Sequence, residues 1–270
     1  MSDKYPNYNW LYIAWFFFYL IFFSVITGGI ALIFYAVSVP FAFSPIAEKL
    51  WRVTSGVRPL RLKSEKIRLI PLFKEVYIRV VKIHGNKISR GIKLYIQESM
   101  DINAYAFGKG TLVLTLGSVQ LLNDECLKGL IAHELGHFEN GDTQRNLLMT
   151  VGNFFMSLLM KLADNLRNGL VKASEGSFVV GCVRGIYDFF YTILRGIRFL
   201  GDLILMPVSR QNEYMADGFA NRCGFGEELA EVLNEIYGVS ISSPKTIKEM
   251  IKATHPPITK RIEHLEKYLD

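Results

Sequence analysis

The chain carries near its start a long stretch without charged side chains. No Asp, Glu, Lys, Arg or His occurs between Tyr5 and Ala47. A helix crosses the hydrocarbon core of a bilayer with about 20 apolar residues, so this stretch has room for two short spans. We expect a helical hairpin over residues 10–26 and 30–46 that turns at residues 27–29. One long tilted span with an interfacial end is the alternative, and the stretch is too long for the core of a signal peptide.

The pattern of apolar positions then changes to that of a mixed α/β segment. Residues 60–84 predict a short connection followed by an amphipathic helix. Alternating positions predict strands over residues 91–97, 103–108 and 111–116, with a Gly-Lys-Gly turn between the last two. We therefore expect a small sheet that contains a hairpin.

The next segment has the apolar spacing of an amphipathic helix. Apolar side chains recur at helical spacing at Leu127, Leu130, Ile131, Leu135 and Phe138. Asn123 or Asp124 offers an N-cap, and Asn140-Gly141 offers a stop signal. The sequence therefore predicts a helix over about residues 124–140.

Two further apolar stretches follow this helix. Residues 147–160 are too short for a span, and we expect a buried helix there. Residues 177–209 are apolar except for a narrow stripe at helical spacing, formed by Arg184, Asp188, Arg195, Arg198 and Asp202. The stripe fits two kinds of helix. One is a helix of a soluble domain that is packed on most sides and solvated along the stripe; the other is a lipid-exposed helix whose polar side faces its neighbours. We favour the second.

Composition and charge locate the protein at a membrane. Half of the 270 residues are hydrophobic, and the net charge is +6. The basic residues that follow the apolar stretch are Lys49, Arg52, Arg58, Arg61, Lys63, Lys66 and Arg68. Since such residues collect on the cytoplasmic side, we expect an integral membrane protein with its remaining domain in the cytoplasm, against anionic lipid. No nucleic-acid-binding motif is present, so nucleic acid is not expected as a partner.

Cysteine usage agrees with a reducing compartment. The three cysteines, Cys126, Cys182 and Cys223, are odd in number and widely spaced. They form neither a C-x-x-C motif nor a disulfide framework. We expect small buried hydrophobic residues at these positions.

The helix over residues 124–140 carries the chemistry. His133, Glu134 and His137 form the motif H-E-x-x-H. Two histidines four residues apart leave the same face of a helix, where one zinc ion can take both imidazoles. Glu134 lies beside them without being a ligand, which is the position of a general base that acts on water. A core helix with two satisfied histidines is the alternative.

Spacing alone leaves the third ligand open. A hydrolytic zinc site usually has three protein ligands, and the H-x-x-G-x-x-H continuation of metzincins is absent. Glu213 lies 18 residues after Arg195, so an uninterrupted helix would align it with the polar stripe, although Pro207 intervenes. Asp217, one turn further, is placed to bond a liganding imidazole. Both carboxylates could equally be a solvated helix face, and Asp142 or Glu139 would be the next candidate ligands.

Three motifs in this order resemble one family. The segments HELGHFENGD (133–142), EYMADGFA (213–220) and THPPITKRI (254–262), behind an apolar N-terminal stretch, are similar to HtpX-type membrane zinc metallopeptidases, and more distantly to CAAX-prenyl endopeptidases. The similarity extends over about residues 60–270. The segment NAYAFG (103–108) resembles the edge strand N-A-F-A-T-G of that family, with Tyr105 and Phe107 as departures.

The resemblance implies a role for each matching residue. His133, His137 and Glu213 are implied as ligands of one zinc ion per chain, Glu134 as the catalytic base and Asp217 as the partner of a ligand. His255 and Arg261 match the late histidine and arginine of the family, for which we expect a role at the substrate carbonyl oxygen. A helix cap at His255 and a surface position for Arg261 are the alternative. The substrate-binding strand is implied at Asn103, Ala104, Tyr105, Ala106, Phe107 and Gly108.

We therefore expect a mostly helical α+β protein with a zincin-type metallopeptidase domain, a small sheet with an exposed edge and N-terminal transmembrane helices. The expected division is an anchor over residues 1–48 and a peptidase domain over residues 49–270. The expected activity is hydrolysis of peptide bonds in misfolded or membrane proteins. The alternatives are a prenyl-protein endopeptidase and a non-catalytic membrane adaptor with a vestigial zinc site.

Overall fold

The computed structural model describes residues 8–85, 91–174, 177–240 and 256–269. Its contacts divide the chain into two compact units that do not follow chain order. Residues 41–147 and 209–270 form one, called here the sheet unit, and residues 7–40 and 148–208 form the other, called the helical unit. Each is described by itself below.

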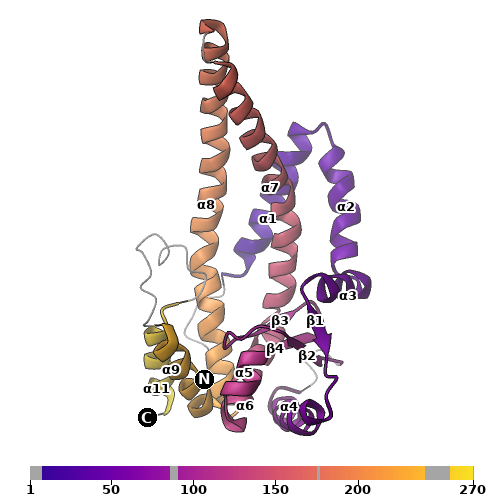
Figure 1. The fold of residues 1–270 in the computed structure, drawn as a ribbon, viewed down its shortest axis with the longest axis vertical. Helices are drawn as coiled ribbons and strands as arrows, with labels where there is room; N and C mark the ends of the chain where they lie inside the picture. Colours follow the sequence, from indigo (N-terminus) through magenta and orange to yellow (C-terminus); the bar gives the residue numbers. More distant parts are fainter. Residues whose placement is uncertain (1–7, 86–90, 175–176, 241–255, 270) are drawn as a thin grey trace. The chain divides into compact units, whose positions relative to one another are not determined.

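The sheet unit contains one four-stranded sheet in the order β1-β2-β4-β3 (Figure 1). Its strands are β1 (Val57–Pro59), β2 (Lys93–Gln97), β3 (Ala104–Phe107) and β4 (Thr111–Thr115). β2 runs parallel to β4, whereas β1 and β3 are antiparallel to their neighbours, so β3 forms an edge. The three strands expected from alternation are confirmed. β1 was not expected, because three residues that end in a proline show no alternation.

The helices of the sheet unit lie on both faces of the sheet, and the last two of them pack mainly on other helices. They are α3 (Pro45–Thr54), α4 (Lys63–His84), α5 (Leu116–Leu121), α6 (Asp124–Asn140), α9 (Gly226–Ser240) and α11 (Ile258–Leu269), with the ends of α7 and α8. Leu94, Ile96, Leu112 and Leu114 point to one face and join a core with Leu69, Val76, Leu127 and Ile131 of α4 and α6. Tyr95, Tyr105 and Phe107 point to the other face, which α3 covers (Figure 1).

α3 is held to the outer face of the sheet by aromatic and polar contacts. Trp51 stacks on Phe107 with ring centroids 3.7 Å apart, and it meets Tyr105 edge-on at 5.8 Å. Such aromatic pairs contribute about 0.5–1.5 kcal/mol beyond the area that they bury. The Thr111 hydroxyl donates a hydrogen bond to Glu48 at 2.5 Å and accepts one from Arg52 at 2.7 Å. The outer face of the edge strand is therefore fixed by α3.

Glycines on α6 allow close helix contacts. A Cβ on Gly129 would lie 2.5 Å from the backbone nitrogen of Leu229, at the start of α9. No real Cβ makes such a contact, so one helix would have to shift. α6 and α9 can pack this closely only with glycine at this position.

We expect Gly129→Ala to lower the melting temperature of the purified protein. Alanine favours a helix over glycine by about 1 kcal/mol, but overpacking typically costs about 1–3 kcal/mol, so the net change is destabilising. Gly238→Ala is the matched control, because Gly238 lies in α9 and an added methyl group there would have nothing within 4 Å. It should leave the melting temperature unchanged or raise it. Equal behaviour of the two variants would contradict the close contact.

The helical unit begins with the expected hairpin of apolar helices. α1 spans Trp10–Ile26 and α2 spans Ile30–Ala42, and Gly28 and Gly29 adopt positive φ angles of 59° and 93° in the turn. α2 was expected to reach residue 46 and ends earlier. The reason is Pro45, which keeps the preceding Ser44 extended at ψ 153°, while the Ser44 hydroxyl caps the next helix.

Two long helices complete the helical unit. α7 spans Asp142–Ala173 and α8 spans Phe178–Arg222, and their residues 148–208 pack with α1 and α2. The buried side chains of this core include Tyr12, Phe16, Tyr19, Phe23, Tyr35, Met149, Met156 and Met160. The Tyr35 hydroxyl donates to the carbonyl of Gly152 at 3.0 Å. The unit is thus a bundle joined by aromatic and methionine side chains.

α7 is the described helix that is long and apolar enough, by itself, to cross a membrane. α2 and α3 meet the same criterion only if counted together, and α1 has 17 residues. The helix expected over residues 147–160 is therefore part of a longer helix, and it is buried only in part. The helix continues to Ala173, and Phe154, Leu158 and Leu162 on its outer side are 40–57% exposed.

The first two residues of the polar stripe of α8, Arg184 and Asp188, contact α7 and the residue that follows it. Arg167 of α7 donates to Asp188 at 2.7 Å, and Arg184 donates to the hydroxyl of Ser174 at 3.2 Å. Phe189 and Phe199, on other sides of α8, are 63% and 64% exposed. These contacts agree with the alternative in which α8 is exposed to lipid and turns its polar groups to a neighbouring helix.

Candidate metal centre

α6 presents the two histidines from a well-defined helix. The side chain of Asn123 accepts a hydrogen bond from the backbone nitrogen of Cys126 at 2.7 Å, which is the expected N-cap. Gly141 ends the helix in the left-handed conformation at φ 74°. His133 and Glu134 are buried between these ends, with 4% and 5% of their surfaces exposed. The motif therefore lies on a rigid and largely dehydrated segment.

α8 brings the third candidate ligand to the same place. A Cβ on Gly136 would lie 3.1 Å from the Cα of Ala216 and 3.2 Å from Phe219, so α6 and α8 touch at this glycine. Ala216 lies between the two carboxylates of the E-x-x-x-D pair of α8, and Phe219 follows the pair by two residues. The contact lets Glu213 reach the histidines, and α8 runs through Pro207 without a break.

His133, His137 and Glu213 converge on one point. Their candidate ligand atoms all lie within 4.8 Å of one another. The two Nε2 atoms are 3.2 Å apart, and carboxylate oxygens of Glu213 lie 3.6 Å from Nε2 of His133 and 3.7 Å from Nε2 of His137. Ligands of a tetrahedral zinc ion, each at about 2.0–2.1 Å, are about 3.3 Å from one another. The donor set and its spacing therefore fit zinc.

Both histidines are oriented by a carboxylate on their other nitrogen. Nδ1 of His133 lies 2.9 Å from Asp217, and Nδ1 of His137 lies 2.8 Å from Asp142. Arg145 in turn donates to Asp142 at 2.5 Å. A carboxylate at Nδ1 favours the tautomer with a free Nε2 lone pair, and it raises the basicity of that nitrogen. Both imidazoles are thus prepared to bind a metal through Nε2.

The local field favours a positive charge at the site. Burial would lower the pKa of His133, but Asp217 and Glu213 outweigh burial and raise it to about 10. Burial likewise opposes a raised pKa at His137, where Asp142 and Glu213 prevail. The carboxylates that stabilise a proton on these imidazoles also stabilise a divalent cation that displaces it.

Arg261 joins α11 to this centre. Its guanidinium donates two hydrogen bonds to Asp217, at 2.9 Å and 2.6 Å, and lies 3.1 Å from Glu213. Burial would raise the pKa of Asp217, but Arg261 and His133 keep it below its usual value. Arg261 is 8% exposed, so it is not an ordinary surface residue. It holds the carboxylate of Glu213, which faces the metal position, and the carboxylate of Asp217, which orients His133.

The predicted substrate strand lies beside the metal helix. β3 contacts α6 and pairs on one side with β4, through Ala104↔Leu114 to Phe107↔Thr111. Among the described residues, no strand pairs with its other side. Thr115 donates its backbone N–H to the carbonyl of Asn103 at 3.1 Å. Since bonded pairs alternate in an antiparallel ladder, the N–H and C=O of Ala104 and Ala106 point to the free edge.

Most of these residues were predicted from the sequence, but the role of Asp142 was not. Asp142 was considered only as a substitute ligand, whereas the structure places it against His137. The sequence signal for this role was Gly141, because a left-handed glycine at a helix end turns the chain and brings the next residue, Asp142, back toward that end. His255 lies outside the described residues. Cys126 and Cys223 are buried as expected, and Cys182 is exposed, contrary to expectation, on the apolar helix α8.

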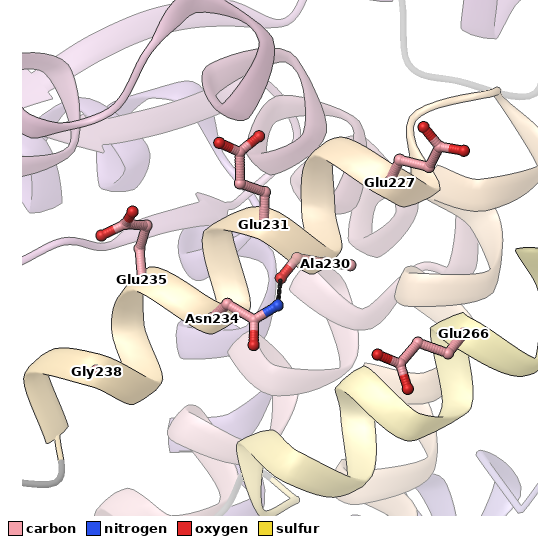
Figure 2. A pocket seen from close by; sticks show the side chains of 7 residues that line it. All are labelled: Glu227, Ala230, Glu231, Asn234, Glu235, Gly238 and Glu266. Carbon is pink, nitrogen blue, oxygen red and sulfur yellow. Dashed lines mark hydrogen bonds between the residues drawn. The ribbon is translucent and has the colours of Figure 1, made fainter.

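A hollow of about 600 Å³ lies elsewhere in the sheet unit, along α9 and α11 (Figure 2). Its lining includes the carboxylates of Glu227, Glu231, Glu235 and Glu266. Figure 2 shows these carboxylates spread along the helices, while Asn234 bonds its own helix at Ala230. None of the lining residues belongs to the metal centre, so the hollow is a solvated acidic surface separate from it.

Comparison with known proteins links the whole arrangement to one family. The family model "Peptidase family M48" matches residues 74–269. "Protease HtpX homolog" of Dictyoglomus turgidum is 31% identical over 208 residues, covering 68% of this chain and 66% of that protein. The chain thus spans just under two thirds of that relative. "Protease HtpX homolog" of Bacillus subtilis is 26% identical over 269 residues, covering 88% of this chain and 86% of that protein.

A solved structure supports the fold independently. The crystal structure of S. mikatae Ste24p superposes with a TM-score of 0.57 at 16% sequence identity, covering 93% of this chain and 61% of that chain. At this identity the similarity concerns the fold alone. It agrees with the mostly helical zincin-type architecture expected from the sequence.

Proposed function

The chain belongs to peptidase family M48, and on that premise we propose that it is a membrane-anchored zinc endopeptidase. The observation that carries the proposal is the convergence of His133, His137 and Glu213 beside the buried Glu134. Three protein ligands leave a fourth position for water or substrate, as in hydrolytic zinc sites, whereas structural sites use four protein ligands. This argues against the adaptor alternative.

Each residue of the site has a proposed task in peptide hydrolysis. When zinc is bound, it polarises the scissile carbonyl and lowers the pKa of a water. Glu134 accepts a proton from the attacking water and passes it to the leaving amine. Asp217 and Asp142 keep the imidazoles of His133 and His137 in the liganding tautomer.

We propose that Arg261 and His255 stabilise the negative charge that develops on the substrate carbonyl oxygen. Arg261 is supported by its place in the centre, where Asp217 and Glu213 hold its guanidinium. Its ion pair with Glu213 also positions that ligand. For His255 the support is its match to the late histidine of the family motif.

The membrane part of the proposal rests on composition and on the exposed apolar helices. α1 and α2 form the proposed anchor within residues 1–48, and residues 49–270 contain the proposed peptidase domain. α7 is long and apolar enough to add a span. From the basic residues that follow the apolar stretch and the positive-inside rule, we propose that the catalytic side faces the cytoplasm.

The proposed substrates are extended polypeptide segments that add to the free edge of β3. Main-chain hydrogen bonds would bind them with little side-chain selectivity. Weak selectivity suits the removal of misfolded or membrane proteins, where location and unfolding select the substrate. No residue of the described site favours a prenyl group, so prenyl-protein cleavage is the second choice.

Metal dependence tests the proposal directly. The purified protein, stripped with a chelator and dialysed, should lose cleavage of casein and recover it with one equivalent of zinc per chain. Zinc content by atomic absorption should rise in parallel with activity. Full activity of the metal-free protein would contradict a zinc peptidase, as would a zinc-loaded protein that cleaves nothing.

A proline at position 106 tests the substrate strand. The N–H of Ala106 points to the free edge rather than to β4, so Ala106→Pro removes a donor for the substrate and leaves the ladder intact. We expect kcat/KM for extended peptides to fall by about tenfold or more, since one main-chain hydrogen bond and its geometry contribute about 1–1.5 kcal/mol. Zinc content should stay normal.

Ala106→Val is the matched control, because valine adds bulk on the same side of the strand and keeps the N–H. It should cleave extended peptides nearly as well as the parent. Unchanged kcat/KM in a folded, zinc-loaded Ala106→Pro protein would show that the segment is only a structural turn. Substitutions of Tyr105 or Phe107 should instead change which peptides are cut.

A further inference from the structure

α3 has two faces with different surroundings. The residues of its outer face, Pro45, Ile46, Lys49, Leu50, Val53 and Thr54, are all exposed. The three large apolar side chains among them, Ile46, Leu50 and Val53, are 70%, 53% and 70% exposed. The opposite face carries Glu48, Trp51 and Arg52, which bind the sheet. The helix thus presents an apolar stripe that no part of the described chain covers.

The chain around α3 indicates what covers this stripe. α2, one of the apolar helices, ends at Ala42, and α3 begins at Pro45, so the stripe continues an apolar segment after a turn. From Lys49 to Ser64 the sequence contains five basic and no acidic residues. Of these, Lys49, Arg61 and Lys63 are exposed. An apolar stripe bordered by lysine and arginine is the pattern of a helix that lies in the surface of an anionic membrane.

We propose that α3 is an interfacial helix that inserts its Ile46, Leu50 and Val53 stripe into the surface of an anionic bilayer. Such helices bury an apolar face about 5–10 Å into the boundary between headgroups and acyl chains. Lys49, on the same face, extends its ammonium toward the phosphates. The proposal concerns a contact between this helix and lipid, and it does not depend on catalysis.

The inner face of α3 connects the lipid surface to the edge strand. Trp51 stacks on Phe107 of β3, and Glu48 accepts a hydrogen bond from the backbone N–H of Lys109 in the β3–β4 turn at 3.3 Å. A Cβ on Gly108 would lie 2.7 Å from the Glu48 carboxylate, so helix and turn are in close contact. α3 therefore holds β3 at the bilayer surface. This consequence rests on the proposed function: the preferred substrates are polypeptide segments that emerge from the membrane.

Spin labels in proteoliposomes test the lipid contact. The exposed Cys182 is first replaced by serine in the full-length chain, and a nitroxide is then attached to Ile46→Cys, Leu50→Cys or Val53→Cys. The controls are Leu121→Cys and Ile78→Cys in the sheet unit, whose parent residues are 62% and 65% exposed. Accessibility to oxygen and to a water-soluble nickel complex is measured in vesicles of phosphatidylglycerol and phosphatidylcholine.

We expect the labels at all three stripe positions to be highly accessible to oxygen and poorly accessible to the nickel complex. The label at Leu121 should show the reverse. Ile78 should resemble Leu121. High nickel accessibility along the stripe would mean that it faces water, which overturns the proposal. Low accessibility to both reagents would mean that a protein surface, such as a second copy of the chain, covers the stripe, which also overturns it.

A charge in the stripe tests the connection to the strand. Leu50→Glu should reduce cleavage of a peptide tethered to lipid severalfold, and it should leave cleavage of the same peptide without a tether unchanged. Leu121→Glu is the control and should change neither rate. Equal rates with the tethered peptide for Leu50→Glu and Leu121→Glu would refute the connection. Loss of all proteolysis in the parent protein would instead refute the proposed function, while the spin-label result would stand.

Discussion

Glu134→Gln abolishes proteolysis and leaves zinc bound, if the site works as proposed. Glu134 is buried on α6 between the two histidines, yet it is not among the three groups that converge on the metal position. Glutamine keeps the size and the hydrogen-bonding reach of the side chain but cannot accept the proton. Loss of a general base typically lowers the rate about 10²–10⁴-fold, and here the same group also protonates the leaving amine.

The measurement is casein or peptide cleavage by protein purified in detergent, with zinc content determined on the same sample. Glu125→Gln is the matched control, because Glu125 lies on the same helix, is exposed and has no proposed role. It should retain both zinc and activity. A fully metal-loaded Glu134→Gln protein with near-normal turnover would remove the basis of the peptidase proposal.

Glu213 and Asp217 should differ sharply in their effects on metal binding. Glu213→Ala deletes one of three ligands, so most of the zinc should be lost on purification. Asp217→Ala keeps all three ligands but removes the partner of His133 Nδ1 and of Arg261, and groups that orient a ligand typically contribute about 10–100-fold in metal affinity. Zinc titration against a competing chelator distinguishes a lost site from a weakened one.

Glu227→Ala serves as the control for both, since Glu227 is an exposed carboxylate of the acidic hollow and not of the metal centre. Its zinc content should equal that of the parent protein. If Glu213→Ala keeps a full equivalent of zinc, Glu213 is not the third ligand. Asp142 or Glu139 would then be examined next.

The helix that carries the two histidines, α6, could be predicted from the sequence because the residues that define it lie close together in the chain. The motif, the N-cap at Asn123 and the stop at Gly141 all act within a few residues of one another. The alternation of β2, β3 and β4 is local in the same way. Resemblance to a family of known fold then supplied Glu213, which spacing alone had left open.

Other features depend on contacts between distant residues and could not be predicted. The pairing of Arg261 with Asp217 joins α11 to α8, and the residue pattern of neither helix predicts this contact. The helix expected over residues 30–46 included only the first two residues of α3, and no element was expected over the rest of it. Only the contacts of Trp51 with Phe107 and of Glu48 with Thr111 show that its other face belongs to the sheet.

The order of the ligands along the chain has a consequence for the timing of activity. His133 and His137 precede the α7–α8 hairpin, and Glu213 follows it. A ribosome therefore exposes two ligands well before the third, and a three-ligand zinc site cannot exist until the hairpin has been made and has returned to α6. Once complete, the site closes the intervening chain into a loop, as a crosslink would. On the proposed function, a newly made chain therefore has no hydrolytic activity until its α7–α8 hairpin is in place.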